Sequence, residues 1–111
     1  MDVLKFKKVA AERKLSMVTC YDSWSAKIIN ATAIDCVLVG DSLGMVMHGY
    51  TSTVPVTVDL MEHHVRAVAS SIKDKLIIAD MPFLSYQQGG VTMFKAVQRL
   101  MQAGAHAVKL E

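Results

Sequence analysis

The stretch CVLVGDS, residues 36–42, decides how this chain is expected to fold. Its first five residues form a nearly continuous apolar run, which is typical of a parallel strand that is buried on both faces. The run leads straight into Asp41. The stretch KLIIADMPF, residues 75–83, repeats the pattern with an apolar run that leads into Asp80. Both stretches therefore predict a buried strand with a carboxylate at its C-terminal end.

Helical patterns alternate with strand patterns along the rest of the chain. The predicted elements are a helix over 2–14, a strand over 17–20, a helix from Asp22 or Ser23 to about 33, a strand over 36–40, a longer loop over 41–57, a helix from Thr57 or Asp59 to about 71, a strand over 75–79, a helix over 92–103 and a strand over 107–111. Alternation of this kind predicts a parallel sheet with right-handed crossovers.

Apolar residues at helical spacing predict which face of each helix is buried. These residues are Leu4, Phe6, Val9 and Ala10 in the first helix, Trp24, Ile28 and Ala31 in the second, Met61, Val65, Val68 and Ala69 in the third, and Phe94, Val97 and Met101 in the fourth. Gly104 is expected to end the fourth helix as its C-cap.

The fold class predicted from this order is α/β. A parallel sheet of four strands leaves both edges bare. We therefore expect residues 1–111 to form one incomplete domain, the first half of a (β/α)8 TIM barrel with an N-terminal helix. The alternative is a doubly wound sheet, which usually carries a glycine-rich first turn. The first turn here, TCYDSWS at residues 19–25, contains no glycine.

Composition excludes several classes of protein. Hydrophobic residues make up 52% of the chain, which argues against disorder, and the net charge is only +2. The basic residues within 5–14 are spaced like the solvated face of a helix, so we expect no nucleic-acid partner. The apolar runs are shorter than the roughly 20 residues of a membrane span, and we expect no membrane partner. Cys20 and Cys36 are interpreted as reduced thiols of a cytoplasmic protein.

Three carboxylates end consecutive predicted strands: Asp41, Asp80 and Glu111, the last residue of AVKLE. The C-terminal ends of parallel strands converge on one face of a barrel, where substrates bind. An oxygen-rich pocket of this kind suits Mg²⁺. One such aspartate alone is more often a turn or cap residue, so the prediction depends on the set. Ser42 adds a hydroxyl at the same level, the alternative being a hydrogen bond within its own turn.

Lys109 is the remaining candidate site residue. It lies two residues before Glu111, and on a strand such residues point to the same side. A lysine beside a metal-binding glutamate can hold a substrate carboxylate or a developing enolate oxygen. The alternative is a salt bridge in the barrel interior. Asp22 is expected to be a helix N-cap, and the four histidines show no metal-binding spacing.

Four runs of the sequence resemble the ketopantoate hydroxymethyltransferase family over residues 4 to 111. The runs are VTCYDSWSAK, DCVLVGDSLGMVMHGYTSTVPVTVDLMEHHVRAV, IIADMPFLSY and AGAHAVKLE, and VGDSLGM followed by STVPVT is the most specific part. By this resemblance the family's magnesium ligands fall on Asp41, Asp80 and Glu111. Its contacts with the oxo acid fall on Asp41, Ser42, Asp80 and Lys109.

The resemblance implies a transferase of pantothenate and coenzyme A biosynthesis. Such an enzyme moves a hydroxymethyl group from 5,10-methylenetetrahydrofolate to 3-methyl-2-oxobutanoate through a Mg-stabilised enolate and gives 2-dehydropantoate. The family's general base is a glutamate of the second half of the barrel, so we expect no catalytic residue before residue 111. The family also implies a homo-oligomer. The alternatives are another Mg-dependent 2-oxo-acid barrel enzyme, such as an isocitrate lyase or PEP mutase relative, and an inert fragment.

Overall fold

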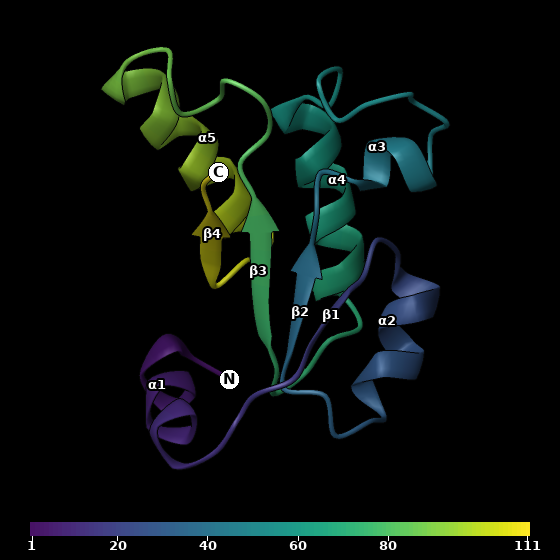
Figure 1. Cartoon of the computed structure of the whole chain (residues 1–111), viewed down its shortest axis with the longest axis vertical. Coiled ribbons are helices and arrows are strands. Elements are labelled where there is room, and N and C mark those ends of the chain that lie inside the picture. Colours follow the sequence, from purple (N-terminus) through teal and green to yellow (C-terminus); the bar gives the residue numbers. More distant parts are fainter.

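Four parallel strands form one sheet in the order β1-β2-β3-β4 in the computed structural model, which describes residues 1–111 (Figure 1). The elements are α1 (Val3–Glu12), β1 (Met17–Thr19), α2 (Ser23–Asn30), β2 (Cys36–Val39), α3 (Leu43–Val46), α4 (Val58–Ala69), β3 (Leu76–Asp80), α5 (Gly90–Ala103) and β4 (Ala107–Lys109). The predicted order of strands and main helices is confirmed, with bounds that shift by a few residues. The short helix α3 lies inside the predicted loop and was not predicted.

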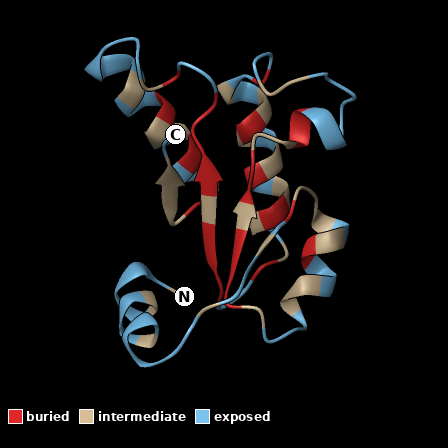
Figure 2. Cartoon of the chain, viewed as in Figure 1, coloured by how far each residue is buried: buried red, intermediate tan, exposed pale blue.

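Helices α2, α4 and α5 pack against the same face of the sheet. Alternate residues of β2 and β3 share one core with these helices: Val37, Val39, Ile77, Ala79, Ala26, Met61, Val65, Val68, Ala96 and Leu100. Both central strands are accordingly buried over most of their length (Figure 2). Sequential strands with all crossovers on one face are the arrangement of a barrel, whereas a doubly wound sheet reverses its order and has helices on both faces. The structure therefore confirms the barrel prediction and excludes the doubly wound alternative.

The opposite face of the sheet is apolar and only partly covered. Leu38 and Ile78 are half-buried there and line a cavity of about 410 Å³ together with Phe6 of α1. Helix α1 lies at the N-terminal end of the strands (Figure 1) and has no buried residue. Of its predicted inner face, Phe6 and Val9 are half-buried, whereas Leu4 and Ala10 are exposed, so that part of the prediction was wrong.

The predicted inner face is correct for α4 but wrong for α2. Met61, Val65 and Val68 are fully buried. In α2, by contrast, Trp24 is 74% exposed and Ile28 is 55% exposed. The other residue predicted inside α2, Ala31, is exposed as well. None of the helices combines the length and apolar character that crossing a lipid bilayer requires.

Small residues explain where α2 and α5 face the sheet. Ala26 is the buried residue of α2, and Ala96, Leu100 and Ala103 are the buried residues of α5. Alanine therefore takes the only buried position of α2 and two of the three buried positions of α5, the third being Leu100. The residues predicted to face inward from α5 are less buried: Phe94 is 67% and Met101 43% exposed, and Val97 is half-buried.

Capping residues begin and end the helices where the sequence predicts. Asp22 caps α2 by accepting the Ser25 N–H at 2.7 Å, and Thr57 caps α4 by accepting the Leu60 N–H at 3.1 Å. Gly104 ends α5 at φ 126°, where an added Cβ would lie 2.4 Å from the Cβ of Ala69. The predicted cap roles of Asp22 and Gly104 are confirmed.

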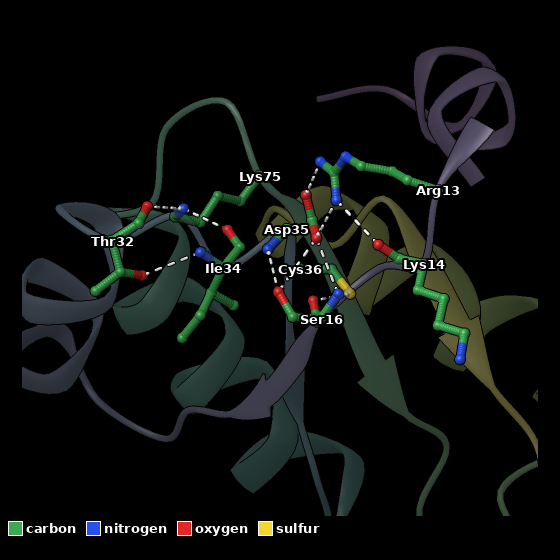
Figure 3. A network of polar contacts seen from close by, with 8 residues as sticks. All are labelled: Arg13, Lys14, Ser16, Thr32, Ile34, Asp35, Cys36 and Lys75. Carbon is green, nitrogen blue, oxygen red and sulfur yellow. Dashed lines mark hydrogen bonds and ion pairs between the residues drawn. The ribbon is translucent and has the colours of Figure 1, made fainter. Parts of the chain in front are cut away.

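Asp35 connects the starts of three strands, and Figure 3 shows its contacts with Ser16 and Arg13. Its carboxylate accepts the N–H of Ser16 at 2.8 Å and the guanidinium of Arg13 at 3.0 Å. Its main-chain N–H donates to the Ser16 carbonyl, and its carbonyl accepts the N–H of Leu76, each at 3.3 Å. The Arg13 guanidinium, helped by the Ser16 N–H, holds the pKa of the Asp35 carboxyl well below its usual range.

Lys75 closes the same end of the sheet from β3. Its ammonium is buried and donates to the main-chain carbonyls of Thr32, at 2.8 Å, and Ile34 (Figure 3). A buried ammonium without partners would be costly. These two carbonyls satisfy it and fasten the turn between α2 and β2 to the start of β3.

Asp35→Asn should destabilise the chain in a pH-dependent way. Because the pKa of Asp35 is lowered in the folded state, its charge stabilises the fold above the ordinary carboxyl pKa of about 4. That contribution is lost as the pH falls through the lower folded pKa. The urea midpoint of Asp35→Asn should lie below wild type at neutral pH, and the gap should narrow below about pH 4.

Glu12→Gln is the control for this experiment, because Glu12 is an exposed carboxylate next to Arg13 in sequence. It should leave the urea midpoint nearly unchanged. A gap between Asp35→Asn and wild type that stays constant from neutral to strongly acidic pH would contradict the assignment.

Candidate functional site

The register of the sheet brings predicted site residues together at its C-terminal end. Asp80 and Lys109 are register partners, and each is the last residue of its strand. Asp41 lies just beyond the end of β2, and its main-chain N–H donates to Oδ2 of Asp80 at 3.0 Å. Residues from three neighbouring strands thus meet where barrel enzymes bind their substrates.

Asp80 is the buried centre of this group, with only 5% of its surface exposed. Its Oδ2 atom accepts the hydrogen bond from Asp41. Its Oδ1 atom makes no hydrogen bond of good geometry, and the ammonium of Lys109, 3.0 Å away, is the charge that balances it. One oxygen of a buried carboxylate therefore has an ionic partner but no hydrogen bond.

Lys109 bridges Asp80 and Glu111. Its ammonium forms an ion pair with each of the two carboxylates. The hydrogen bond to Glu111 raises the pKa of Lys109, as does the ion pair with Asp80, against an opposing effect of burial. The ammonium is therefore charged throughout the physiological range. The salt bridge that was the alternative interpretation of Lys109 is present in this structure.

The pKa of the Asp41 carboxyl reflects both its burial and the excess of negative charge in the group. Burial raises the pKa of its carboxyl, and the charges of Asp80 and Glu111 raise it further, while Lys109 lowers it. Three carboxylates face a single ammonium. The group is therefore undercompensated by protein cations.

The donor set suits Mg²⁺ in chemistry, although the three carboxylates do not converge on one point. No group of three or more acidic, cysteine or histidine side chains stands ready to hold a metal ion. Lys109 lies between Asp80 and Glu111, and Glu111 is 72% exposed at the end of the sheet. A metal ion would have to replace the ammonium as the bridge. Carboxylate oxygens, a negative surplus and the unsatisfied Oδ1 of Asp80 fit that exchange.

Ser42 hydrogen-bonds outside its own turn. It is the N-cap of α3, yet its hydroxyl makes no capping bond. The hydroxyl instead lies 2.7 Å from the phenol oxygen of Tyr21. Gly40 lies beside both the Ser42 hydroxyl and the Asp80 carboxylate: an added Cβ there would be 3.2 Å from Ser42 Oγ and 3.4 Å from Asp80 Oδ2. The turn alternative for Ser42 was wrong, and its hydroxyl and Asp80 Oδ2 both lie beside Gly40.

The similarity to a known family covers the whole sequence. The model of the ketopantoate hydroxymethyltransferase family matches residues 1–111. The chain belongs to this family. It is 57% identical over 99 residues to the 3-methyl-2-oxobutanoate hydroxymethyltransferase of Coxiella burnetii, and 55% identical over 109 residues to that of Francisella tularensis. These alignments cover 89% and 98% of this chain but only 37% and 41% of the relatives.

This member of the ketopantoate hydroxymethyltransferase family thus spans about two fifths of the length of those relatives. The family expected from the sequence is confirmed. The residues assigned to the metal ion and to the oxo acid stay predictions.

Solved structures of the PEP mutase/isocitrate lyase superfamily share the fold. A phosphonopyruvate hydrolase in complex with oxalate and Mg²⁺ matches with a TM-score of 0.75 and 16% identity, over 89% of this chain and 34% of that chain. A 2,3-dimethylmalate lyase of that superfamily matches with a TM-score of 0.71 and 17% identity, over 97% and 39%. The four strands and the N-terminal helix of the chain correspond to the first part of this (β/α)8 barrel fold.

The sequence did not identify three residues beside the carboxylates: Gly40, Tyr21 and His64. An added Cβ at Gly40 would lie 3.4 Å from Asp80 Oδ2, the phenol of Tyr21 contacts Ser42, and His64 hydrogen-bonds the main chain of Tyr21. These contacts join separate segments of the chain, so no spacing in the sequence indicates them.

Asp41→Asn should stabilise the metal-free chain at neutral pH. Because the pKa of Asp41 is raised in the folded state, ionising it costs more in the fold than in the unfolded chain. The cost is absent below the ordinary carboxyl pKa of about 4 and is complete above the raised folded value. In the presence of a chelator, the melting temperature of Asp41→Asn should exceed wild type at neutral pH and converge with it at about pH 3. A lower melting temperature at neutral pH would refute the charge surplus.

Proposed function

We propose that this chain supplies the magnesium and oxo-acid subsites of a 3-methyl-2-oxobutanoate hydroxymethyltransferase. The reaction transfers a hydroxymethyl group from 5,10-methylenetetrahydrofolate to 3-methyl-2-oxobutanoate and gives 2-dehydropantoate, a step of pantothenate and coenzyme A biosynthesis. One observation carries the proposal in a member of this family: at the C-terminal end of the sheet the ammonium of Lys109 pairs with Asp80 and Glu111, and the main-chain N–H of Asp41 donates to Asp80.

Asp41, Asp80 and Glu111 are proposed to hold Mg²⁺. The ion would act there as a Lewis acid that polarises the carboxylate and keto oxygens of the oxo acid and so acidifies the neighbouring C–H. Support comes from the oxygen donors, from the negative surplus at Asp41 and from the fold shared with a phosphonopyruvate hydrolase whose structure contains oxalate and Mg²⁺.

Lys109 and Ser42 are proposed to orient the oxo acid. If Asp80 and Glu111 coordinate a metal ion, their oxygens are no longer available to the ammonium of Lys109. It is then free to pair with an oxygen of the oxo acid, and its raised pKa keeps it charged for that role. The hydroxyl of Ser42 is close to the same group and can donate one hydrogen bond to the acid.

The proton acceptor is proposed to lie beyond residue 111. Removing the proton at carbon 3 requires a base within about 3 Å of it, directly or through one water. Asp41, Asp80 and Glu111 are poor bases while they hold a metal ion. The family resemblance assigns the base to a glutamate of the second half of the barrel, which agrees with this division of roles.

A second candidate is a different 2-oxo-acid reaction of the same barrel superfamily, such as C–C cleavage by a lyase. The shared fold favours it, but the relatives named lyase or hydrolase are only 16–17% identical, against 55–57% for the hydroxymethyltransferases. Turnover assays on the full-length protein separate the two. Formation of 2-dehydropantoate from methylenetetrahydrofolate supports the first, and cleavage of a 2,3-disubstituted malate without folate supports the second.

Asp80→Asn should weaken Mg²⁺ binding in the full-length protein while leaving the fold intact. The substitution keeps the shape of the buried side chain and removes one charged ligand. The dissociation constant should rise about tenfold or more, as expected for a loss of about 1.5–3 kcal/mol. Calorimetric titration with Mg²⁺ measures it. Asp74→Asn changes an exposed aspartate near the opposite end of β3 and is the control; wild-type affinity in Asp80→Asn would remove Asp80 from the ligands.

Lys109→Ala should chiefly impair oxo-acid binding in the presence of Mg²⁺. Loss of one charge-assisted hydrogen bond predicts an affinity for 3-methyl-2-oxobutanoate that is about ten- to hundredfold weaker. Calorimetry gives the affinity, and thermal melting on the same samples gives the stability. If oxo-acid affinity and turnover stay at wild-type levels while the melting temperature drops sharply, Lys109 serves only as a salt bridge.

A further inference from the structure

His64 of α4 hydrogen-bonds the main chain at the end of β1. Its Nδ1 atom lies 2.5 Å from the carbonyl oxygen of Tyr21. A carbonyl oxygen can only accept, so Nδ1 of His64 must carry the proton and donate. This bond links two elements that are 43 residues apart in sequence. It fixes the point from which the Tyr21 side chain projects.

His48 makes the second contact of the same ring. The Nε2 atoms of His48 and His64 lie 2.9 Å apart, and the two rings meet edge to face at 88°. When His64 is neutral with its proton on Nδ1, its Nε2 accepts and His48 donates. His48 follows α3, the helix that Ser42 begins. His64 therefore contacts both the Tyr21 main chain and the segment that leads away from Ser42.

The side chain of Tyr21 connects this restrained main chain to Ser42. Its phenol oxygen lies 2.7 Å from Ser42 Oγ, and Tyr21 and Ser42 are both half-buried. The Ser42 hydroxyl caps no helix. Tyr21 is thus the side chain that sets the direction of that hydroxyl, since Gly40 offers it only space.

We propose that His64 is a positioning residue for the oxo acid. It holds the Tyr21 main chain, and the Tyr21 phenol then fixes the hydroxyl of Ser42 toward the ligand. His64 itself does not contact the ligand in this arrangement. The inference rests on the proposed function for the identity of the ligand, and on the hydrogen bonds described above for the path from His64 to Ser42.

Four variants of the full-length protein test the path. His64→Leu removes both hydrogen bonds of the ring. His64→Asn restores one of them, because its Nδ2–H takes the place of Nδ1–H and can donate to the Tyr21 carbonyl. Tyr21→Phe keeps the aromatic ring and removes the phenol oxygen. His63→Leu is the matched control, because His63 is the exposed neighbour of His64 on the same helix.

The first measurement is the affinity for 3-methyl-2-oxobutanoate by calorimetry with Mg²⁺ present. His64→Leu and Tyr21→Phe should each weaken binding about three- to tenfold, the usual effect of one hydrogen bond. His64→Asn and His63→Leu should bind nearly as wild type does. The double variant His64→Leu with Tyr21→Phe should bind no worse than Tyr21→Phe alone, because both changes act through one phenol. Additive losses, or wild-type affinity in His64→Leu, would overturn the inference.

The second measurement uses no ligand. The ¹³C NMR signals of the Tyr21 ring should move in His64→Leu and return to the wild-type position in His64→Asn. Tyr21 signals at the same positions in His64→Leu and wild type would overturn the inference, whatever the ligand is. Failure of the proposed function has a different signature, namely no binding of 3-methyl-2-oxobutanoate to the wild-type protein.

Discussion

Asp35 sets the alignment on which the rest of the sheet depends. A parallel sheet has no hairpin turns to fix the register of its strands, and a slip by one residue turns every side chain to the other face. Asp35 binds Ser16 at the start of β1 through its side chain and main chain, and it accepts the N–H of Leu76 at the start of β3. One residue therefore aligns three strands at their N-terminal ends. The pairing of Val39 with Ala79 follows from this alignment and places Gly40 and Asp80 at one level.

The charged side chains at the two ends of the sheet differ in how fully they are paired. At the N-terminal end, Arg13 and the Ser16 N–H stabilise the charge of Asp35, whose pKa is lowered, and two carbonyls accept hydrogen bonds from Lys75. At the C-terminal end, burial and then the charges of Asp80 and Glu111 raise the pKa of Asp41, and one oxygen of Asp80 has no hydrogen bond. Uncompensated charge is costly in a buried place. It is retained where a ligand of opposite charge can neutralise it, which is the physical reason to assign function to this end.

The sequence predicts the fold well because the strong signals are local. Apolar runs, caps such as Asp22 and the alternation of elements specify the strands and their order. The inner faces of α2 and α5 could not be predicted from residue size, since alanines and not Trp24 or Phe94 face the sheet. Among site residues, the carboxylates are visible because each ends a strand. The link from His64 through Tyr21 to Ser42 joins three separate segments, and no spacing in a single sequence encodes such a contact.

Lys109 shows how two interpretations of one residue can describe two states of one site. In the metal-free chain its ammonium is the only cation that balances Asp80 and Glu111, and it takes the bridging position between them. Under the proposed function, a divalent ion bound to these carboxylates would compete with the ammonium for their charge. The ammonium of Lys109 would then pair with an oxygen of the oxo acid. The salt bridge and the proposed substrate contact are compatible, because each pairs the same ammonium with a negatively charged oxygen.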